Sequence, residues 1–277
     1  MDRNLRRPAV DLEAYFARIG YRGPRAPTIE TLRALHELHP AAIAFEAIDV
    51  LLGRSIDLSP SAVDAKLIGR RRGGYCYEQN LLFKRVLTAL GFAVDGLAAR
   101  VRWMVPPEAL PRPRSHMALR VIVDGAPWLA DVGFGGCVLT APLHLDSTAP
   151  QPTRHGTFRL TPTGSDRLLE ASLGADWAPL LEIAREPQLD VDYELANWYA
   201  STHPSSLFRR TLMIARTTPR ARYALLQNRL TVRTPDGAVE RSALTADEIE
   251  RALTDIFGLP VEPEWRPVIE RAAAGDA

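Results

Sequence analysis

One cysteine of the chain stands at a position that favours a reactive sulfur. Cys76 follows Gly73 and Gly74 and opens a segment whose apolar residues recur at helical spacing. Free backbone N–H groups and the positive end of the helix dipole favour a thiolate over a thiol at such a helix start. The same N–H groups, that of Tyr77 included, could stabilise an oxyanion formed when the sulfur attacks a carbonyl. Cys76 is therefore a candidate nucleophile, with a small buried cysteine at a helix start as the alternative interpretation.

A thiolate nucleophile needs a base, and the sequence contains six histidines. Five of them suit plain structural roles in a helix, in loops or at the ends of elements: His36, His39, His144, His155 and His203. His116 differs because it begins a strand-like run and a second such run, which carries Asp131, follows closely. In a Cys-His-Asp arrangement like that of cysteine proteases, Cys76 attacks, His116 takes the thiol proton and Asp131 fixes the imidazole tautomer.

The spacing of His116 and Asp131 predicts contact across a hairpin. If Asp124-Gly125 forms a two-residue turn, His116 stands opposite Gly133. Asp131 is then the diagonal neighbour of His116 on the same face, at about 7–8 Å between Cα atoms. A four-residue turn would separate the pair further, and an odd loop length would put the two side chains on opposite faces. Asp131 also lies in an apolar run, where a buried carboxylate needs partners, although a plain strand-end charge is the alternative.

The elements that must position these residues change in kind along the chain. Apolar residues recur at helical spacing up to about residue 90. Three helix start signals lie within this region: Asp11, Thr28 and Ser59-Pro60. Strand-like segments follow at 92–105, 116–123 and 128–134. Further turn candidates are Thr163-Gly164 and Gly174-Ala175.

Beyond residue 190 the pattern is mixed. The expected elements are a helix over 193–200, strands over 212–217 and 222–234, a turn at 235–237 and a last helix behind the capping box of Thr245 and Glu248. Helices first, strands second and a mixed tail predict an α+β fold. We expect three regions, over residues 1–90, 91–190 and 191–277, with the nucleophile in the first and His116 and Asp131 in the second.

Composition narrows the class of protein. The chain has 277 residues, 46% of them hydrophobic and 24% charged, which is the profile of an ordinary soluble globular protein. Its 34 basic and 33 acidic residues give no reason to expect a nucleic-acid or membrane partner. No signal sequence, transmembrane run, metal-ligand spacing or phosphate-binding glycine motif is present in the sequence. Two cysteines form no disulfide framework, so a reducing cytoplasm is the expected location.

The motifs together resemble the arylamine N-acetyltransferases. The resemblance is carried by the run from Arg72 to Asn80 (RGGYCYEQN), by the His116 strand and by the run from Asp131 to Gly135 (DVGFG). Shorter matching pieces lie at 15–20, 32–36, 45–46 and 205–208. The similarity spans residues 10–220 or so, and its central motif is long enough to make chance similarity a poor explanation.

The resemblance implies a helical N-terminal region, a central β-barrel-like region and a C-terminal α/β lid. It also implies a two-step reaction in which acetyl-CoA, as the acyl-donor substrate and without a metal, acetylates Cys76. An arylamine, arylhydrazine or N-hydroxyarylamine then takes the acetyl group. Phe45, Phe134 and Phe208 match positions that line the acceptor pocket of the family, although core packing is an equal alternative for each. Backbone groups of the loop at residues 133–137, with Gly133 and Gly135, are weaker candidates for holding CoA.

Other interpretations remain open at this point. Ala44 and Ala47 replace a proline and an asparagine common in the family, and Leu207 stands where a proline is frequent. These departures leave room for a relative of the same family, an amide synthase that releases a polyketide from a carrier protein. A Cys-His-Asp hydrolase would use the same residue types, and a non-enzymatic CoA or aryl-binding protein is the fourth hypothesis. The physiological amine, the preferred acyl chain and the oligomeric state do not follow from the sequence.

Overall fold

The computed structural model describes residues 10–106, 108–173 and 176–275 of the chain. The α-helices are α1 (Leu12–Ile19), α2 (Ile29–Ala42), α3 (Ile48–Leu51), α4 (Pro60–Asp64), α5 (Cys76–Ala89), α6 (Asp192–Thr202), α7 (Ala246–Asp255) and α8 (Arg266–Ala274). Single turns of 3-10 or π helix cover Ala65–Gly69 (η1), Gly135–Cys137 (η2), Leu207–Arg209 (η3) and Pro263–Trp265 (η4). Within the described ranges, every helix is too short or too polar to cross a lipid bilayer.

Two antiparallel sheets complete the α+β fold. The strands are β1 (Phe45–Glu46), β2 (Ala93–Val101), β3 (His116–Val123), β4 (Ala126–Ala130), β5 (Leu143–His144), β6 (Gln151–Thr153), β7 (Gly156–Thr163), β8 (Asp166–Leu173), β9 (Asp176–Gln188), β10 (Met213–Thr217), β11 (Arg222–Leu226), β12 (Arg229–Arg233) and β13 (Val239–Ala243). The larger sheet has the order β5-β4-β3-β2-β9-β8-β7-β6 and is nearly closed, like a barrel. The smaller sheet has the order β1-β10-β11-β12-β13.

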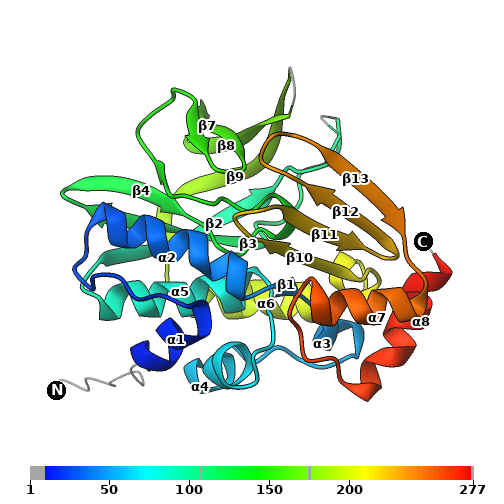
Figure 1. Cartoon of the computed structure of the whole chain (residues 1–277). Helices are drawn as coiled ribbons and strands as arrows, with labels where there is room; N and C mark the ends of the chain where they lie inside the picture. The colour runs from blue at the N-terminus through cyan, green and yellow to red at the C-terminus, as the bar shows by residue number, and fades with distance from the viewer. Residues whose placement is uncertain (1–9, 107, 174–175, 276–277) are drawn as a thin grey trace.

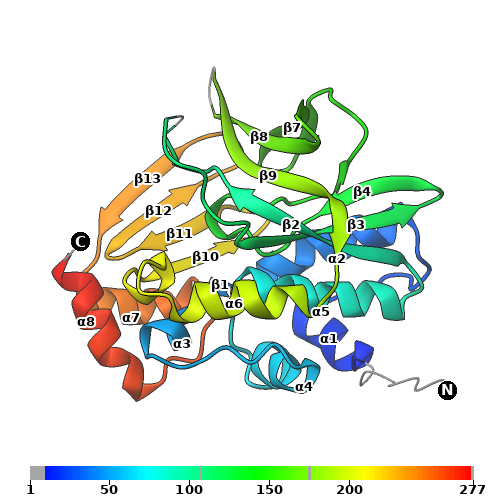
Figure 2. The ribbon, with the colours of Figure 1, turned by 180° about the vertical axis from the view of Figure 1, so that it is seen from behind.

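The helices cover the larger sheet on one side and flank the smaller one. Figure 1 shows α2 and α5 below β3 and β4, with α7 and α8 beside the smaller sheet. Figure 2 shows α6 crossing the opposite side of the molecule in front of α5. One apolar core joins the N-terminal helices to β3, and separate cores fill the larger sheet and the C-terminal part. This arrangement agrees with the expected helical, barrel-like and C-terminal α/β regions, and the boundaries at residues 90 and 190 stay a prediction.

Three of the predicted start signals cap their helices, whereas Ser59 precedes Pro60 at the start of α4 without a side-chain capping hydrogen bond. Asp11 accepts a hydrogen bond from the backbone N–H of Ala14 at 3.0 Å, and Gly20 ends α1 in the left-handed conformation at φ 73°. Thr28 caps α2. Thr245 and Glu248 form the capping box of α7.

The hairpin that brings His116 and Asp131 together has the predicted two-residue turn. Val123 pairs with Ala126, and Asp124 and Gly125 both have positive φ, of 50° and 78°. Positive φ at both central residues is typical of a type I′ turn, which suits the twist of the flanking strands. The predicted turn after β7 also forms, whereas Gly174-Ala175 lies outside the described residues.

Three predicted strands have different bounds in the structure. The segment expected at 128–134 is a strand only over Ala126–Ala130, and the segment expected at 92–105 is a strand only over Ala93–Val101. The run at 222–234 is not one strand but two, β11 and β12, because Gln227 takes a left-handed φ of 53° and turns the chain. Neither the two-residue strand β1 nor helix α8 was expected from the sequence.

Candidate active site

Cys76 is the first residue of α5, and the chain before it is held from two sides. The backbone N–H of Gly74 donates to Ala44 O at 3.2 Å, and Gly74 O accepts from Glu46 N at 3.1 Å. A Cβ at Gly73 would lie 2.3 Å from Ala44 O, so only glycine permits this approach. Glu78 then accepts the N–H of Tyr75 at 3.0 Å and closes the helix start. The space beside the two glycines is therefore filled by the chain itself.

The three predicted catalytic side chains meet at this helix start. His116 Nε2 lies 2.6 Å from Asp131 Oδ2, and both residues are buried. This leaves Nδ1 as the ring nitrogen that can face Cys76, and the Cys76 side chain lies close enough to help raise the pKa of the imidazole. The sulfur also lies 3.9 Å from the carbonyl oxygen of Ser115. A nucleophile, a base and a carboxylate that orients the base thus form a continuous chain of contacts.

The charges in this chain of contacts favour a protonated imidazole. Burial lowers the pKa of His116, but the Asp131 carboxylate and the neighbouring Cys76 more than offset it and raise that pKa to about 10. Burial acts to raise the pKa of Asp131, and the His116, Asn80 and Gly133 hydrogen bonds outweigh it, so that pKa is lowered. The site is therefore built to hold an imidazolium between a carboxylate and a sulfur.

Two further residues hold Asp131, and sequence reasoning missed both roles. Asn80, one helical turn after Cys76, donates from Nδ2 to Asp131 Oδ1 at 3.0 Å and to Met117 O at 2.7 Å. His36 accepts the backbone N–H of Asp131 at 3.0 Å, and burial lowers its pKa to about 4, so it stays neutral. The available signal for Asn80 was a polar residue four positions after the nucleophile, on the same helical face.

The backbone after Asp131 leaves the sheet because its N–H groups bond to side chains. Val132 N donates to Asn80 Oδ1 at 3.1 Å, and Gly133 N donates to Asp131 Oδ1 at 2.9 Å. These bonds replace ladder bonds and explain why β4 ends at Ala130. A Cβ at Gly133 would lie 2.8 Å from the Cα of Cys76, so this glycine lets the loop pass directly over the nucleophile.

Of the three predicted pocket phenylalanines, one contacts the triad directly and the other two contact each other. Phe134 meets the His116 ring edge-to-face at 5.4 Å between centroids. Phe45 and Phe208 lie 6.1 Å apart, and Phe208 also contacts Tyr75 at 5.4 Å. Gly135, at a positive φ of 76°, lies against Phe45, since a Cβ there would be 3.4 Å from that ring. The side chains of Phe45, Phe134 and Phe208 are only partly buried.

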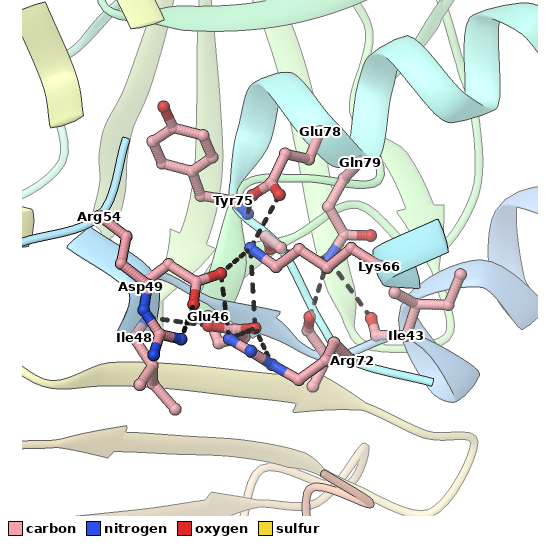
Figure 3. Close-up of polar contacts among 12 residues, drawn as sticks. Ile43, Glu46, Ile48, Asp49, Arg54, Lys66, Arg72, Tyr75, Glu78 and Gln79 are labelled. Atoms are coloured by element: carbon pink, nitrogen blue, oxygen red, sulfur yellow. Dashed lines mark hydrogen bonds and ion pairs between the residues drawn. The ribbon is translucent and has the colours of Figure 1, made fainter. Parts of the chain in front are cut away.

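A buried ionic cluster lies next to the start of α5, and it was not predicted from the sequence. It comprises Glu46, Asp49, Lys66, Arg72 and Glu78. Lys66 Nζ lies 2.8 Å from both Asp49 and Glu78, and Arg72 lies 2.9 Å from Glu46 (Figure 3). Burial lowers the pKa of Lys66, but Glu78, Glu46 and Asp49 outweigh it and raise that pKa. Lys66 therefore stays charged and ties the capping carboxylate of Glu78 to a second element.

The remaining candidate residues have simpler surroundings. Tyr77 is the second residue of α5, so its backbone N–H lies in the first helical turn, where no intrahelical carbonyl is available. Cys137 packs beside the core of the larger sheet, and burial raises the pKa of its thiol against the effect of Arg222. Within the part of the chain that the structure describes, no group of three His, Cys, Asp or Glu side chains could hold a metal ion.

Comparisons with known proteins agree with the resemblance. A family model described as N-acetyltransferase matches residues 28–266. An arylamine N-acetyltransferase of Mycolicibacterium smegmatis is 43% identical over 255 residues, which is 91% of this chain and 92% of that protein. The structure of arylamine-N-acetyltransferase from M. tuberculosis has a TM-score of 0.91 at 39% identity and covers 95% of this chain and 100% of that one.

A further solved structure is that of the Mycobacterium marinum arylamine N-acetyltransferase in complex with CoA. It has a TM-score of 0.89 at 39% identity and covers 95% of this chain and 98% of that one. The family model spans well over half of the chain, and the sequence similarity extends over nearly all of it. The chain is therefore an acyltransferase that belongs to the arylamine N-acetyltransferase family.

Proposed function

We propose that this protein transfers an acetyl group from acetyl-CoA to an arylamine, an arylhydrazine or an N-hydroxyarylamine by way of an acetylated Cys76. The observation that carries the proposal is the contact of Cys76, His116 and Asp131 at the start of α5. The CoA bound to the M. marinum relative supports a CoA thioester as donor. Relatives named arylamine N-acetyltransferase support the acceptor class.

In the first half-reaction, the Cys76 sulfur attacks the thioester carbonyl carbon. The developing oxyanion accepts hydrogen bonds from free N–H groups of the first helical turn, with Tyr77 as the proposed donor. The bond between carbonyl carbon and CoA sulfur then breaks, and His116 gives its proton to the departing CoA thiolate. An acetyl-Cys76 thioester and free CoA thiol result.

In the second half-reaction, the amine nitrogen attacks the acetyl carbon. His116, neutral after the first step, takes the proton that the amine loses, and the bond to the Cys76 sulfur breaks. The sulfur leaves as a thiolate beside the newly formed imidazolium, so the starting state is restored. Asp131 holds the ring in one tautomer through both steps.

The aromatic side chains and the glycine loop beside the triad suit the two substrates. We assign Phe45, Phe134 and Phe208 to the aryl acceptor, because their partly buried rings gather beside the triad and suit a flat aromatic amine. Gly133 and Gly135 are proposed to pass close to the CoA pantetheine through backbone groups. Cytoplasmic location remains part of the proposal, because a reactive thiolate suits a reducing compartment.

Mass spectrometry of the denatured protein tests the intermediate. After mixing with acetyl-CoA and no amine, we expect one acetyl group on the peptide that contains Cys76. The adduct should vanish in Cys76→Ser and persist in the matched variant Cys137→Ser. No adduct, or an adduct unchanged by Cys76→Ser, would contradict the proposal.

A turnover assay distinguishes the proposed acetyltransferase from its main alternative, an amide synthase. An acetyl-CoA-dependent enzyme converts free acetyl-CoA with a simple aryl hydrazine, whereas an amide synthase that works on carrier-bound chains does not. Acylation of Cys76 by a carrier-bound acyl chain, together with no acylation by free acetyl-CoA, would favour the amide synthase.

A further inference from the structure

Helix α6 carries apolar side chains on the face that points away from the protein. Among the described residues, eight large apolar side chains are strongly exposed, and five of them lie on or beside α6: Leu189, Val191, Leu195, Trp198 and Leu207. Leu195 is 76% exposed and Trp198 63% exposed. A tryptophan in water is uncommon without a partner, and contiguous exposed apolar surface marks an interaction site more often than chance.

Three of these exposed residues form one stripe along α6. Val191, Leu195 and Trp198 are spaced by four and three residues, so they share a face of the helix. The buried residues Tyr193 and Ala200 lie on the opposite face, where they join the core of the helical region. The sequence of α6 is thus apolar on both sides, a pattern typical of a helix covered on both sides. In Figure 2, α6 lies on the outside of the molecule, and no other helix or strand of the described residues crosses it.

The charged residues near this stripe are acidic at one end and basic at the other. Asp192 and Glu194 are exposed at the N-terminal end of α6. Arg209 and Arg210 are exposed just beyond the C-terminal end, and Arg209 donates to the carbonyl oxygen of Thr202 at 2.6 Å. A second α6 laid antiparallel on the first would bring acidic ends next to basic ends and would oppose the two helix dipoles. A parallel arrangement would bring like charges together.

We propose that the outer face of α6 is the interface of a two-fold symmetric homodimer, in which the Val191-Leu195-Trp198 stripe packs antiparallel on the same stripe of a second copy. A two-fold axis makes the surface self-complementary, as the division of charge along α6 requires. Leu195, in the middle of the stripe, lies near the axis and faces its own copy. Because one helix pair buries less area than a standard interface, the dimer forms in a concentration-dependent manner.

Sedimentation velocity of the full-length protein over a range of concentrations tests this interface. We expect a monomer–dimer equilibrium whose dissociation constant rises at least about tenfold in Leu195→Glu, since symmetry places two charges in the apolar centre. The matched control is Leu110→Glu, which replaces a leucine 87% exposed elsewhere and should leave the equilibrium unchanged. A chain that stays monomeric up to about 200 μM, or a dimer equally stable in Leu195→Glu, would overturn the proposal.

Cross-linking provides a second readout that does not depend on a destabilised variant. In a Cys76→Ser, Cys137→Ser background, Leu195→Cys should form a disulfide-linked dimer on mild oxidation, because the position faces its own copy. Leu226→Cys, which is 47% exposed on β11, is the control and should remain monomeric. Equal cross-linking of the two variants would contradict the interface. Binding of the stripe to an acyl-carrier protein or to lipid vesicles by a strictly monomeric chain would also rule out the second copy as its occupant.

Discussion

The amide of Asn80 and the N–H of Gly133 determine the orientation of the new side chain in Asp131→Asn. Both donate to Asp131 Oδ1, while His116 Nε2 faces Oδ2. In Asp131→Asn, the new carbonyl oxygen must take the Oδ1 position, so the NH2 group faces His116. That group donates to Nε2 and forces the ring proton onto Nδ1, which is the wrong tautomer for a base that faces Cys76.

We expect Asp131→Asn to slow acetylation of Cys76 by about 10³–10⁴-fold with little change in fold. Rapid-quench mass spectrometry of the acetyl-enzyme measures the rate directly. The control is Asp95→Asn, a half-exposed carboxylate paired with Arg120 on the surface of β2, which should leave the rate unchanged. A rate loss below tenfold in Asp131→Asn would mean that the carboxylate does not set the tautomer.

The raised pKa of His116 predicts the pH at which its imidazole loses a proton. Because that pKa is raised to about 10, the NMR signals of the His116 ring should remain those of an imidazolium up to about pH 9. In His116→Gln the positive charge beside Cys76 is gone, so alkylation of Cys76 by iodoacetamide at neutral pH should be slower than in the wild type. Peptide mapping separates Cys76 from Cys137. Ring signals of His116 that titrate at about pH 6.5 would contradict the imidazolium assignment.

At the scale of elements, Lys66 is the residue that ties the nucleophile helix to its surroundings. Its ammonium lies 2.8 Å from Glu78, which caps α5, and 2.8 Å from Asp49 in α3. Lys66→Met leaves both carboxylates buried without this partner. We expect a loss of about 3–5 kcal/mol in the free energy of unfolding, measured by urea denaturation.

The matched control for Lys66→Met is Arg120→Met, which breaks a surface pair with Asp95 and should cost less than about 1 kcal/mol. Adding Glu78→Gln to Lys66→Met removes one stranded charge and should recover part of the loss. Equal effects of Lys66→Met and Arg120→Met would show that the buried cluster does not hold the helix start.

A substitution at Gly133 gives a second prediction at the scale of elements. A Cβ there would lie 2.8 Å from the Cα of Cys76, and backbone atoms cannot move aside as a flexible side chain can. Gly133→Ala should therefore displace the loop from α5, lower the stability by about 1–3 kcal/mol and slow acetylation of Cys76. Gly125→Ser is a useful contrast: no atom of the described residues lies within 4 Å of a Cβ at Gly125, so only its positive φ resists the change. An unchanged acetylation rate in Gly133→Ala would show that the close approach of this loop to Cys76 matters for packing alone.

Across the whole molecule, the features that the sequence predicted are those that depend on neighbouring residues. The caps at Asp11 and Thr245 and the Asp124-Gly125 turn involve contacts within a few positions. That turn aligned His116 with Asp131, and the helix start marked Cys76. The sequence therefore pointed to the three residues that the structure brings together.

The features that sequence reasoning missed depend on residues far apart in the chain. Strand β1 exists only because Phe45 pairs with Ala215, and the role of His36 requires Asp131, which lies 95 residues later. The ionic cluster likewise joins Glu46 to Arg72. The turn at Gln227 was missed for a different reason, since glutamine at positive φ is uncommon and gives no local turn signal.

Two buried neutral histidines give the whole molecule a predicted sensitivity to acid. Burial lowers the pKa of His36 to about 4 and that of His39 to about 3, and His39 is held between Tyr15 and Gln79. Both pKa values lie below the value of about 6.5 expected in the unfolded chain. The unfolded state therefore binds more protons between pH 6.5 and pH 4, so the free energy of unfolding falls as the pH decreases through this window. Each histidine contributes a slope of up to about 1.4 kcal/mol per pH unit.

The pH slope of the unfolding free energy, compared between the wild type and His39→Gln, separates the contribution of His39 from those of the other titrating groups. Glu78, whose pKa is raised by burial, acts in the opposite direction in part of the same window, so the slope of the wild type alone is not decisive. In His39→Gln the amide can still meet Tyr15 and Gln79, but no proton is taken up on unfolding. We expect the slope of unfolding free energy between pH 6 and pH 4.5 to be smaller by about 1.4 kcal/mol per pH unit than in the wild type. Equal slopes in the wild type and His39→Gln would show that His39 is not a buried neutral group in the folded protein.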